Sequence, residues 1–210
     1  KPLPGQLAGV VKGNFPSFLR KTDQERAQNL TRDLRRWEDE GATWECTEKL
    51  DGSSMTCYLH EGVFGVCSRN YDLEETEGNA FWTVARRDLD GRLPAGFAVQ
   101  GELIGPGIQG NKYGLHEPDF YAFDVWDIHS QRYLTPAERA TFCKVFSIKH
   151  VPIIDDAFSA SSDVAALLTM ADGQSKIGCK PAREGLVFKN TVTDDSFKAI
   201  SNKWLLKNEE

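Results

Sequence analysis

The chain has 210 residues, 40% of them hydrophobic, which suits one globular domain, and no apolar stretch reaches the length of a membrane span. The formal net charge of −6 argues against a protein that binds nucleic acid through bulk positive charge, while it leaves room for an enzyme with a local basic site. The five cysteines form no Cys-x-x-Cys pair and the N-terminal residues do not resemble a signal peptide, so we expect reduced thiols in an intracellular compartment, the cytoplasm or the nucleus.

The N-terminal part of the chain predicts a loop and then one amphipathic helix. Thr22 is a suitable N-cap, and acidic residues follow it in what would be the first helical turn. The helix is predicted over 24–40, because Leu30, Leu34 and Trp37 fall on one face at helical spacing. The glycine that follows is typical of a helix C-terminus.

The rest of the chain alternates between predicted strands and helices. Residues 43–49 half alternate between apolar and polar side chains, as a strand does, and end just before an Asp-Gly turn. The other predicted strands cover 55–59, 63–68, 97–104, 120–128, 152–156, 185–190 and 197–201. The other predicted helices lie within 79–89 and over 135–149 and 162–170. Hairpin-linked strands with interspersed helices predict a single α+β domain with mostly antiparallel sheets.

A glycine-rich segment at 105–110 matches the Gly-x-Gly-x-x-Gly fingerprint of dinucleotide-binding proteins. That fingerprint requires a helix to begin at the third glycine, so that the helix N-terminus meets the pyrophosphate. Here the third glycine is followed by Asn111-Lys112-Tyr113-Gly114, which predicts a loop, and no βαβ unit surrounds the segment. We therefore do not assign it to dinucleotide binding.

The candidate nucleophile is Lys49, which ends a predicted strand just before the turn at Asp51-Gly52. A lysine held there can point its amine into a cleft, and it becomes a good nucleophile when neighbouring cations or burial lower its pKa. A solvated lysine on a surface hairpin would show the same short motif. The motif alone does not separate these two interpretations.

Lys49-Leu50-Asp51-Gly52 resembles the first signature of the covalent nucleotidyltransferases, the superfamily of ATP-dependent DNA ligases, RNA ligases and mRNA capping enzymes. In that superfamily the lysine attacks the α-phosphate of a nucleoside triphosphate and carries the nucleotide as a phosphoramidate. The resemblance implies a ligase-type nucleotidyltransferase fold, similar to ATP-grasp, with 1–210 as one nucleotidyltransferase domain. Further signatures follow in the family's order at 68–70, 100–105, 120–127, 183–189 and 196–204.

The resemblance also implies roles for single residues. The implied catalytic residues are Lys49, Lys198, Lys203 and Arg69. The implied ATP-binding residues are Glu48, Lys49, Ser54, Arg69, Glu102, Phe123, Glu184 and Lys198. In this scheme Glu48 and Phe123 hold adenine and Glu102 holds the ribose. Asp51, Glu102 and Glu184 would hold Mg²⁺ or Mn²⁺, in part through its water shell.

Several of these residues also have a plain structural interpretation. Phe123 lies in a strand that alternates aromatic and acidic residues, and such aromatics usually belong to a core. A glutamate such as Glu102 at a strand end is often solvated, and Lys198 could lie on a strand surface. Where many relatives have a second lysine, this chain has Ile200, and Lys203 comes three residues later.

Two features resemble the RNA ligases within the superfamily. DNA ligases and capping enzymes usually carry an arginine five residues after the lysine, whereas this chain has Ser54 there. RNA ligases that seal nicked duplexes carry a small polar residue, usually Asn, and place their arginine on the next hairpin, as Arg69 is placed here. The resemblance implies a monomeric, ATP-dependent RNA ligase that joins 5′-phosphate and 3′-hydroxyl RNA ends. The alternatives are a DNA ligase adenylation domain, a capping guanylyltransferase and a nucleotide-binding module without catalysis.

The two ends of the chain bear on its domain organisation. The sequence starts without Met and ends a few residues after the signature at 196–204. Some RNA ligases carry an N-terminal OB-type module, so we expect this chain to be a fragment that lacks such a module. Its loss would remove phosphate contacts and lower the affinity for RNA.

Overall fold

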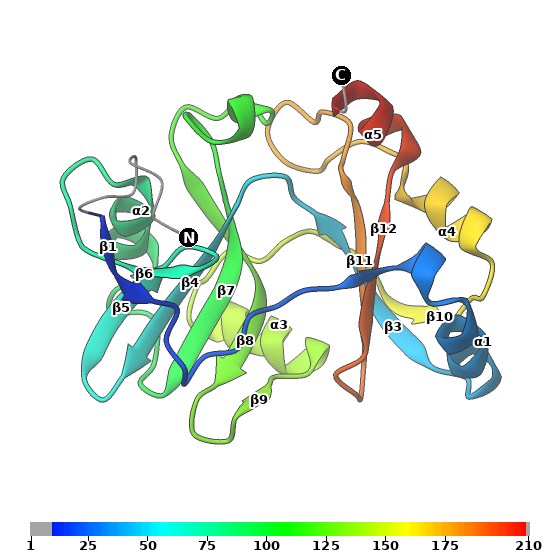
Figure 1. The fold of residues 1–210 in the computed structure, drawn as a ribbon, viewed down its shortest axis with the longest axis horizontal. Coiled ribbons are helices and arrows are strands. Elements are labelled where there is room, and N and C mark those ends of the chain that lie inside the picture. Colours follow the sequence, from blue (N-terminus) through cyan, green and yellow to red (C-terminus); the bar gives the residue numbers. More distant parts are fainter. Residues whose placement is uncertain (1–9, 209–210) are drawn as a thin grey trace.

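The computed structural model describes residues 10–208 and contains two β-sheets that lie side by side, each with its own helices (Figure 1). The seven-stranded sheet runs in the order β1 (Val11–Asn14), β6 (Tyr71–Leu73), β5 (Val63–Cys67), β4 (Ser53–His60), β7 (Phe97–Ile104), β8 (Asp119–Asp127) and β9 (Arg132–Tyr133). The five-stranded sheet runs in the order β10 (Ile153–Ser159), β3 (Thr43–Lys49), β11 (Gly185–Asn190), β12 (Ser196–Ile200) and β2 (Glu25–Arg26). Neighbouring strands are antiparallel apart from β12 and β2, so the predicted α+β class is confirmed.

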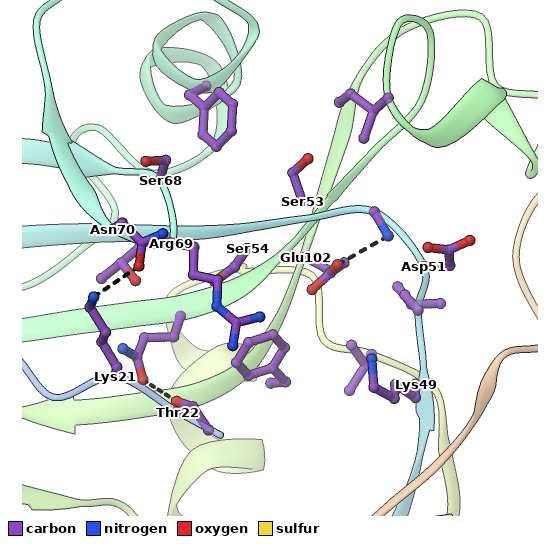
Figure 2. A pocket seen from close by; sticks show the side chains of 18 of the residues that line it. Lys21, Thr22, Lys49, Asp51, Ser53, Ser54, Ser68, Arg69, Asn70 and Glu102 are labelled. Carbon is purple, nitrogen blue, oxygen red and sulfur yellow. Dashed lines mark hydrogen bonds between the residues drawn. The ribbon is translucent and has the colours of Figure 1, made fainter. Parts of the chain in front are cut away.

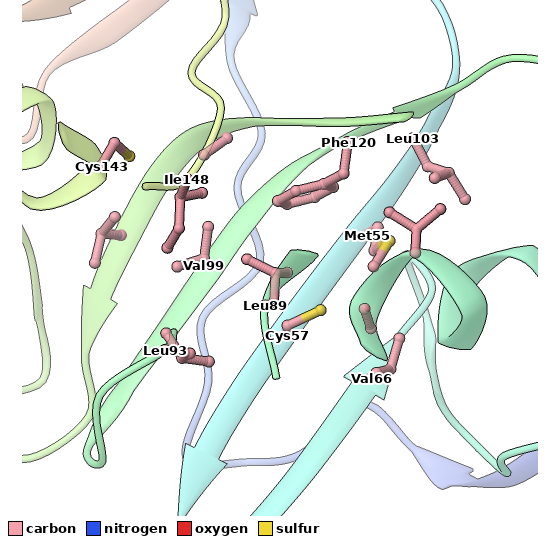
Figure 3. Close-up of a cluster of buried hydrophobic side chains, with 14 of the residues drawn as sticks. Met55, Cys57, Val66, Leu89, Leu93, Val99, Leu103, Phe120, Cys143 and Ile148 are labelled. Carbon is pink, nitrogen blue, oxygen red and sulfur yellow. The ribbon is translucent and has the colours of Figure 1, made fainter. Parts of the chain in front are cut away.

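Each sheet buries a separate hydrophobic core against helices. The helices are α1 (Thr31–Asp39), α2 (Ala80–Asp88), α3 (Pro136–Val145), α4 (Val164–Ala171) and α5 (Asn202–Asn208). Val84 of α2 and Phe142 of α3 belong to the core of the seven-stranded sheet, which Figure 3 shows from close by. Leu34 of α1 and Leu167 of α4 belong to the core of the five-stranded sheet. Burial of these apolar side chains supplies most of the stabilisation of both halves.

Strand alternation places the first core and a cavity on opposite faces of the same strands. On β4, Met55 and Cys57 are fully buried in the core, whereas Ser54 and Thr56 line the cavity on the other face. On β7 the core residues are Val99 and Leu103, and the cavity residues are Gln100 and Glu102. Because successive side chains point to opposite faces of a strand, the core residues and the cavity residues alternate along both strands.

A β-bulge on β8 interrupts this alternation at Phe123. Asp124 pairs with Gln100 and Ala122 pairs with Gly101, so Phe123 is the extra residue between two consecutive partners on β7. The core-facing positions of β8 are even-numbered before the bulge and odd-numbered after it. Such a bulge re-aims a side chain, and here Phe123 lines the cavity.

The largest difference from the sequence prediction lies at the start of the first helix. The predicted helix over 24–40 is wrong in its first part, because α1 begins only at Thr31, after β2 and a 3₁₀ turn. Thr22 is not an N-cap, and its hydroxyl donates instead to Gln100 Oε1 at 2.7 Å. The physical reason is that Glu25–Arg26 pair with the edge of β12, a tertiary contact that overrides the local helical pattern.

The other predicted elements are present, with small shifts at their ends. β7 and β11 have the predicted bounds, whereas α3 ends at Val145 rather than at 149, because Ser147 has a positive φ of 55°. The sequence prediction missed the short strands β1, β6 and β9 and the helix α5. Among residues 10–208, every helix is too short or too polar to span a lipid bilayer.

Candidate active site

A cavity of about 1190 Å³ lies between the two sheets and is lined by residues of both. Lys49 and Lys198 come from the five-stranded sheet, and Ser54 and Glu102 come from the seven-stranded sheet. Figure 2 shows Lys49, Ser54, Arg69 and Glu102 around the same space. Of the site residues predicted from the sequence, all except Lys203 line this cavity.

The position of Lys49 follows from strand register. Lys49 is the last residue of β3 and pairs with Gly185 on β11, which places it next to Glu184. The Lys49 Nζ lies 3.0 Å from Glu184 Oε1, and the two side chains are 26% and 14% exposed. The amine is thus held in place while it stays accessible from the cavity, as the sequence predicts for a lysine at a strand end.

Two glycines let the backbone pack closely around these residues. A Cβ atom on Gly52 would lie 2.2 Å from the carbonyl oxygen of Leu103, and one on Gly185 would lie 2.2 Å from the carbonyl oxygen of Ala199. Both distances are far below van der Waals contact, so any side chain would push neighbouring strands apart. This explains why Gly52 directly follows Asp51, and why Gly185, the first residue of β11, directly follows Glu184. Both carboxylates are candidate metal ligands.

Three interactions hold the turn that follows Lys49. The Asp51 amide donates to the Tyr113 hydroxyl at 2.7 Å, and the Gly52 amide donates to Glu102 Oε1 at 3.0 Å. The Asp51 carboxylate forms an ion pair with the Lys112 ammonium. Glu102 therefore supports the turn in addition to facing the cavity (Figure 2).

Two carboxylates in the cavity, Glu102 and Glu184, hold protons more tightly than usual. Burial raises the pKa of Glu102 to about 7; the Lys49 charge opposes this rise, while the charges of Glu184 and Asp51 add to it. Burial also raises the pKa of Glu184, against the opposing effect of Lys49. Like charges in a partly buried site favour protonation, so a cation that entered the cavity would favour the ionised carboxylates.

One part of the cavity offers an unpaired acceptor to a ligand. Glu48 is only 1% exposed, and its Oε2 accepts a hydrogen bond from the Lys176 amide at 2.9 Å. Its Oε1 is buried without any hydrogen-bond partner. Because an unsatisfied buried acceptor is costly, this position favours a ligand that brings an N–H donor.

Phe123 is held from behind by buried charges. The Lys189 ammonium donates to the Phe123 carbonyl oxygen at 2.5 Å, lies 5.3 Å from the Phe123 ring centroid and forms an ion pair with Asp124 at 2.9 Å. Burial lowers the pKa of Lys189, and the Asp124 charge opposes this effect. The ring is thus fixed in a position where a planar group could stack on it.

Two of the predicted phosphate-binding cations meet at one carboxylate. Asp23 lies 3.9 Å from Arg69 and 3.8 Å from Lys198, so it joins a cation beside the first sheet to a cation on the second. The Asp23 side chain is 73% exposed, and both distances are long for ion pairs. A phosphate group could take the place of this carboxylate between the same two cations.

The comparison with protein families agrees with this geometry. A family model described as RNA ligase matches residues 42–202, which include every site residue named above apart from those before β3 and Lys203. The chain belongs to the RNA ligase family. The resemblance stated from the signatures is therefore confirmed.

Three solved structures of the RNA ligase of Naegleria gruberi are similar to this chain over almost its whole length. A lysine-to-alanine variant with ATP and Mn has 44% identity and a TM-score of 0.89, covering 99% of this chain and 64% of that one. A lysine-to-methionine variant with AMP and Mn has 44% identity and a TM-score of 0.89, covering 99% and 63%. A glutamate-to-alanine variant with ATP and Mn has 43% identity and a TM-score of 0.90, covering 100% and 64%. This chain thus spans less than two thirds of the length of those structures, and the comparison with curated proteins gave no match.

Lys203 is the one RNA ligase signature residue that the structure keeps apart from the others. Its side chain is 77% exposed, lies 3.7 Å from Asp172 and does not line the cavity. Ile200, at the position where many relatives have a lysine, is buried. Lys198 is therefore the lysine of this RNA ligase signature that lines the same cavity as Lys49.

The carboxylates of this RNA ligase chain fit a hydrated cation better than a bare one. Asp51, Glu102 and Glu184 all line the cavity. Within residues 10–208, however, no three Asp, Glu, His or Cys side chains come close enough to hold a metal ion directly. Mg²⁺ gives up water reluctantly, so this donor set suits a divalent cation that keeps its water shell.

Three residues of the site were not predicted from the sequence, namely Asp23, Lys112 and Tyr113. The buried ion pair of Lys189 with Asp124 was not predicted either. Lys112 and Tyr113 lie in the glycine-rich loop directly after the strand that carries Glu102, and this position is the signal that could have identified them. Lys189 carries a charge in an otherwise apolar strand, which is a signal for a buried ion pair.

Proposed function

We propose that this chain is the adenylyltransferase part of an ATP-dependent RNA ligase. The Lys49 amine attacks the α-phosphate of ATP, a P–N bond forms, the bond to the bridging oxygen breaks and pyrophosphate leaves. AMP then passes to an RNA 5′-phosphate, and a 3′-hydroxyl displaces it. The observation that carries the proposal is the Lys49 amine in a cavity that also holds the unpaired Glu48 oxygen, in a chain of the RNA ligase family.

The unpaired Glu48 oxygen supports ATP over GTP as the substrate. The 6-amino group of adenine can donate a hydrogen bond to Glu48 Oε1, which is buried and has no partner in the protein. Guanine carries a carbonyl oxygen at that position, which would face a carboxylate without a proton between them. Phe123 would stack on the base, as aromatic side chains do with any nucleobase.

Charge neutralisation accounts for the remaining residues. Lys198 and Arg69 would hold phosphate oxygens, and Ser54 lies opposite Glu102 in the β4–β7 ladder, within the same cavity. Phosphoryl transfer depends mainly on positioning and on charge stabilisation. A hydrated Mg²⁺ or Mn²⁺, held by Asp51, Glu102 and Glu184, would supply positive charge beside the α-phosphate, and the similar Naegleria structures contain ATP and Mn.

The finer features of the substrate are also part of the proposal. We propose that a monomer acts on RNA with 5′-phosphate and 3′-hydroxyl ends at a nick in a duplex. Ser54 and Arg69, which resemble the nick-sealing ligases in position, support this choice. The five cysteines are all free, which supports a reducing intracellular compartment.

Intact mass spectrometry after incubation with ATP and Mg²⁺ or Mn²⁺ tests the first step. We expect a gain of one AMP that is lost when pyrophosphate is added and is absent in Lys49→Met. Lys144→Met, which changes an exposed lysine on α3, should keep the adduct. GTP in parallel should give little adduct.

The outcomes separate the proposal from its alternatives. An adduct that persists in Lys49→Met would remove Lys49 as the nucleophile, and an adduct with GTP alone would favour a capping guanylyltransferase. No adduct with any nucleotide would favour a binding module. If the adduct forms, sealing of nicks with RNA or DNA on the 3′-hydroxyl side distinguishes an RNA ligase from a DNA ligase.

A further inference from the structure

The glycine-rich loop 105–118 contacts the candidate metal-binding turn directly. It follows β7 and places Lys112 and Tyr113 against Asp51, which lies 61 and 62 residues earlier in the chain. The two contacts differ in kind, because Tyr113 binds the Asp51 backbone while Lys112 binds its carboxylate. The loop that matches a dinucleotide fingerprint in sequence thus serves the turn beside the nucleophile.

The Lys112 ammonium pairs with the Asp51 carboxylate, which a divalent cation would also need. It forms an ion pair with Asp51 Oδ2 and lies 4.8 Å from the centroid of the Trp204 ring on α5. The Lys112 side chain is 33% exposed, so it can turn out toward water, whereas the Asp51 side chain is only 15% exposed. Partly exposed ion pairs contribute little free energy, so an incoming ion of higher charge can displace this lysine.

Asp51 would keep its place after Lys112 has left. Its amide donates to the Tyr113 hydroxyl at 2.7 Å, and the next amide, of Gly52, donates to Glu102 at 3.0 Å. Tyr113 is itself buried, in a small cluster with Leu50. The turn is therefore anchored by contacts that do not involve Lys112, so Lys112 can leave Asp51 without releasing the turn.

We infer that Lys112 is an internal counter-ion of Asp51 that a hydrated divalent cation must displace. Lys112 and the metal compete for one carboxylate, so the lysine lowers the affinity of the free chain for the metal. The inference rests on the proposed function, because that proposal brings the metal to Asp51. Its test uses metal binding without nucleotide, so it can fail while Lys49 adenylylation succeeds, and the reverse.

The test measures Mn²⁺ binding to the nucleotide-free chain, from the electron paramagnetic resonance signal of unbound Mn²⁺. We expect Lys112→Met to bind Mn²⁺ about tenfold more tightly than the unchanged chain, since one nearby unit of positive charge is removed. Lys112→Arg keeps the charge and should stay within about twofold. Lys180→Met removes one charge from the neighbouring segment, where it forms no ion pair with Asp51, and should also have little effect.

Trp204 provides a second readout that does not depend on activity. Because Lys112 lies over its ring, Mg²⁺ should change tryptophan emission in the unchanged chain but not in Lys112→Met. Trp204→Phe should remove the change in emission and leave the Mg²⁺ affinity, measured by calorimetry, nearly unchanged. Circular dichroism of each variant checks that the fold is kept.

Three results would overturn the inference. Equal or weaker Mn²⁺ binding by Lys112→Met would mean that Lys112 holds Asp51 in place for the metal instead of competing with it. A Lys112→Met chain that binds no Mn²⁺ at all would do the same, since freeing Asp51 must expose a cation site. An emission change that persists in Lys112→Met would show that Trp204 responds to something other than this lysine.

Discussion

The two oxygens of the Glu48 carboxylate have different surroundings, and this difference makes nucleotide choice testable at a single residue. Oε2 accepts the Lys176 amide at 2.9 Å, whereas Oε1 is buried and unpaired. In Glu48→Gln the amide oxygen must stay with the Lys176 N–H, so the amide NH₂ would point into the cavity. It would face the adenine amino group as a second donor, and it would match the guanine carbonyl.

We therefore predict that Glu48→Gln lowers the rate of ATP adduct formation by about tenfold and raises the rate with GTP. The measurement is the ratio of AMP to GMP adducts by intact mass at limiting nucleotide. Because the shape of the side chain is kept, the melting temperature should change little. An unchanged ratio would mean that Glu48 does not read the base.

The positions of single residues were predictable where the local sequence determines the backbone geometry. Lys49 ends a strand just before the Asp51-Gly52 turn, Glu184 directly precedes the glycine that begins a strand, and both line the cavity as expected. The partners of Lys112 and Asp23 were not predictable, because each lies far away in sequence. The Lys112–Asp51 pair spans 61 positions, and no local sequence pattern indicates which loop contacts which turn.

Elements were predictable where periodicity and glycine agreed. The bounds of β7 and β11 follow from alternation ended by glycine or polar residues, and those strands carry Glu102 and follow Glu184. The stretch before α1 failed because its partner is β12, at the other end of the chain. The bulge at Phe123 shifts the alternation of apolar residues along β8 by one position. A prediction that assumes strict alternation along the strand misses this shift.

The stretch before α1, where the helix prediction was wrong, belongs to a segment that crosses the cavity. Residues 20–26, the crossing segment, bond to the first sheet through Lys21 and Thr22 and to the second through the pairing of β2 with β12 (Figure 1). Asp23 lies midway along it, between Arg69 and Lys198. In the free chain this carboxylate therefore partly neutralises the cations proposed to hold phosphate.

We predict that Asp23→Asn raises the affinity for ATP by about threefold at low salt, because Arg69 and Lys198 lose a competing negative charge. Calorimetric titration of the Lys49→Met background measures binding without transfer. The gain should shrink at high salt, since Asp23 is largely exposed.

The matched control is Asp194→Asn. Asp194 pairs with Arg20 of the crossing segment at 3.9 Å and is also exposed, but it does not line the nucleotide cavity. Its loss should leave ATP affinity unchanged. If Asp23→Asn instead weakened ATP binding, Asp23 would be positioning the crossing segment and not competing with phosphate.

At the scale of the whole molecule, the two sheets form two halves with the cavity between them. Each sheet buries its own hydrophobic core, and the cavity between them gathers Glu102 from one side and Glu184 from the other. The pKa of Glu102 is raised to about 7 by burial and by the charges of Glu184 and Asp51. Ionisation of Glu102 therefore places a negative charge in one half near the Glu184 carboxylate of the other half.

This charge arrangement predicts how stability without metal depends on pH. The folded pKa of Glu102, about 7, lies above the ordinary value of 4.5, so the folded chain binds this proton more tightly than the unfolded chain does. The resulting stabilisation is complete below pH 4.5 and is lost as the pH rises through 7. Between pH 5 and 8 in EDTA, the unfolding free energy of the unchanged chain should fall relative to Glu102→Gln by on the order of 2 kcal/mol, or about 5 °C in Tm.

Urea unfolding of both chains across this pH range measures the difference in slope, so any constant cost of the substitution cancels. Glu184 is present in both chains, and burial raises its pKa in each. Glu117→Gln, which changes a carboxylate that is 76% exposed, should leave the slope of the unchanged chain as it is. Parallel curves for the unchanged chain and Glu102→Gln would mean that Glu102 is ionised at an ordinary pKa, and that the two halves do not repel one another through this pair.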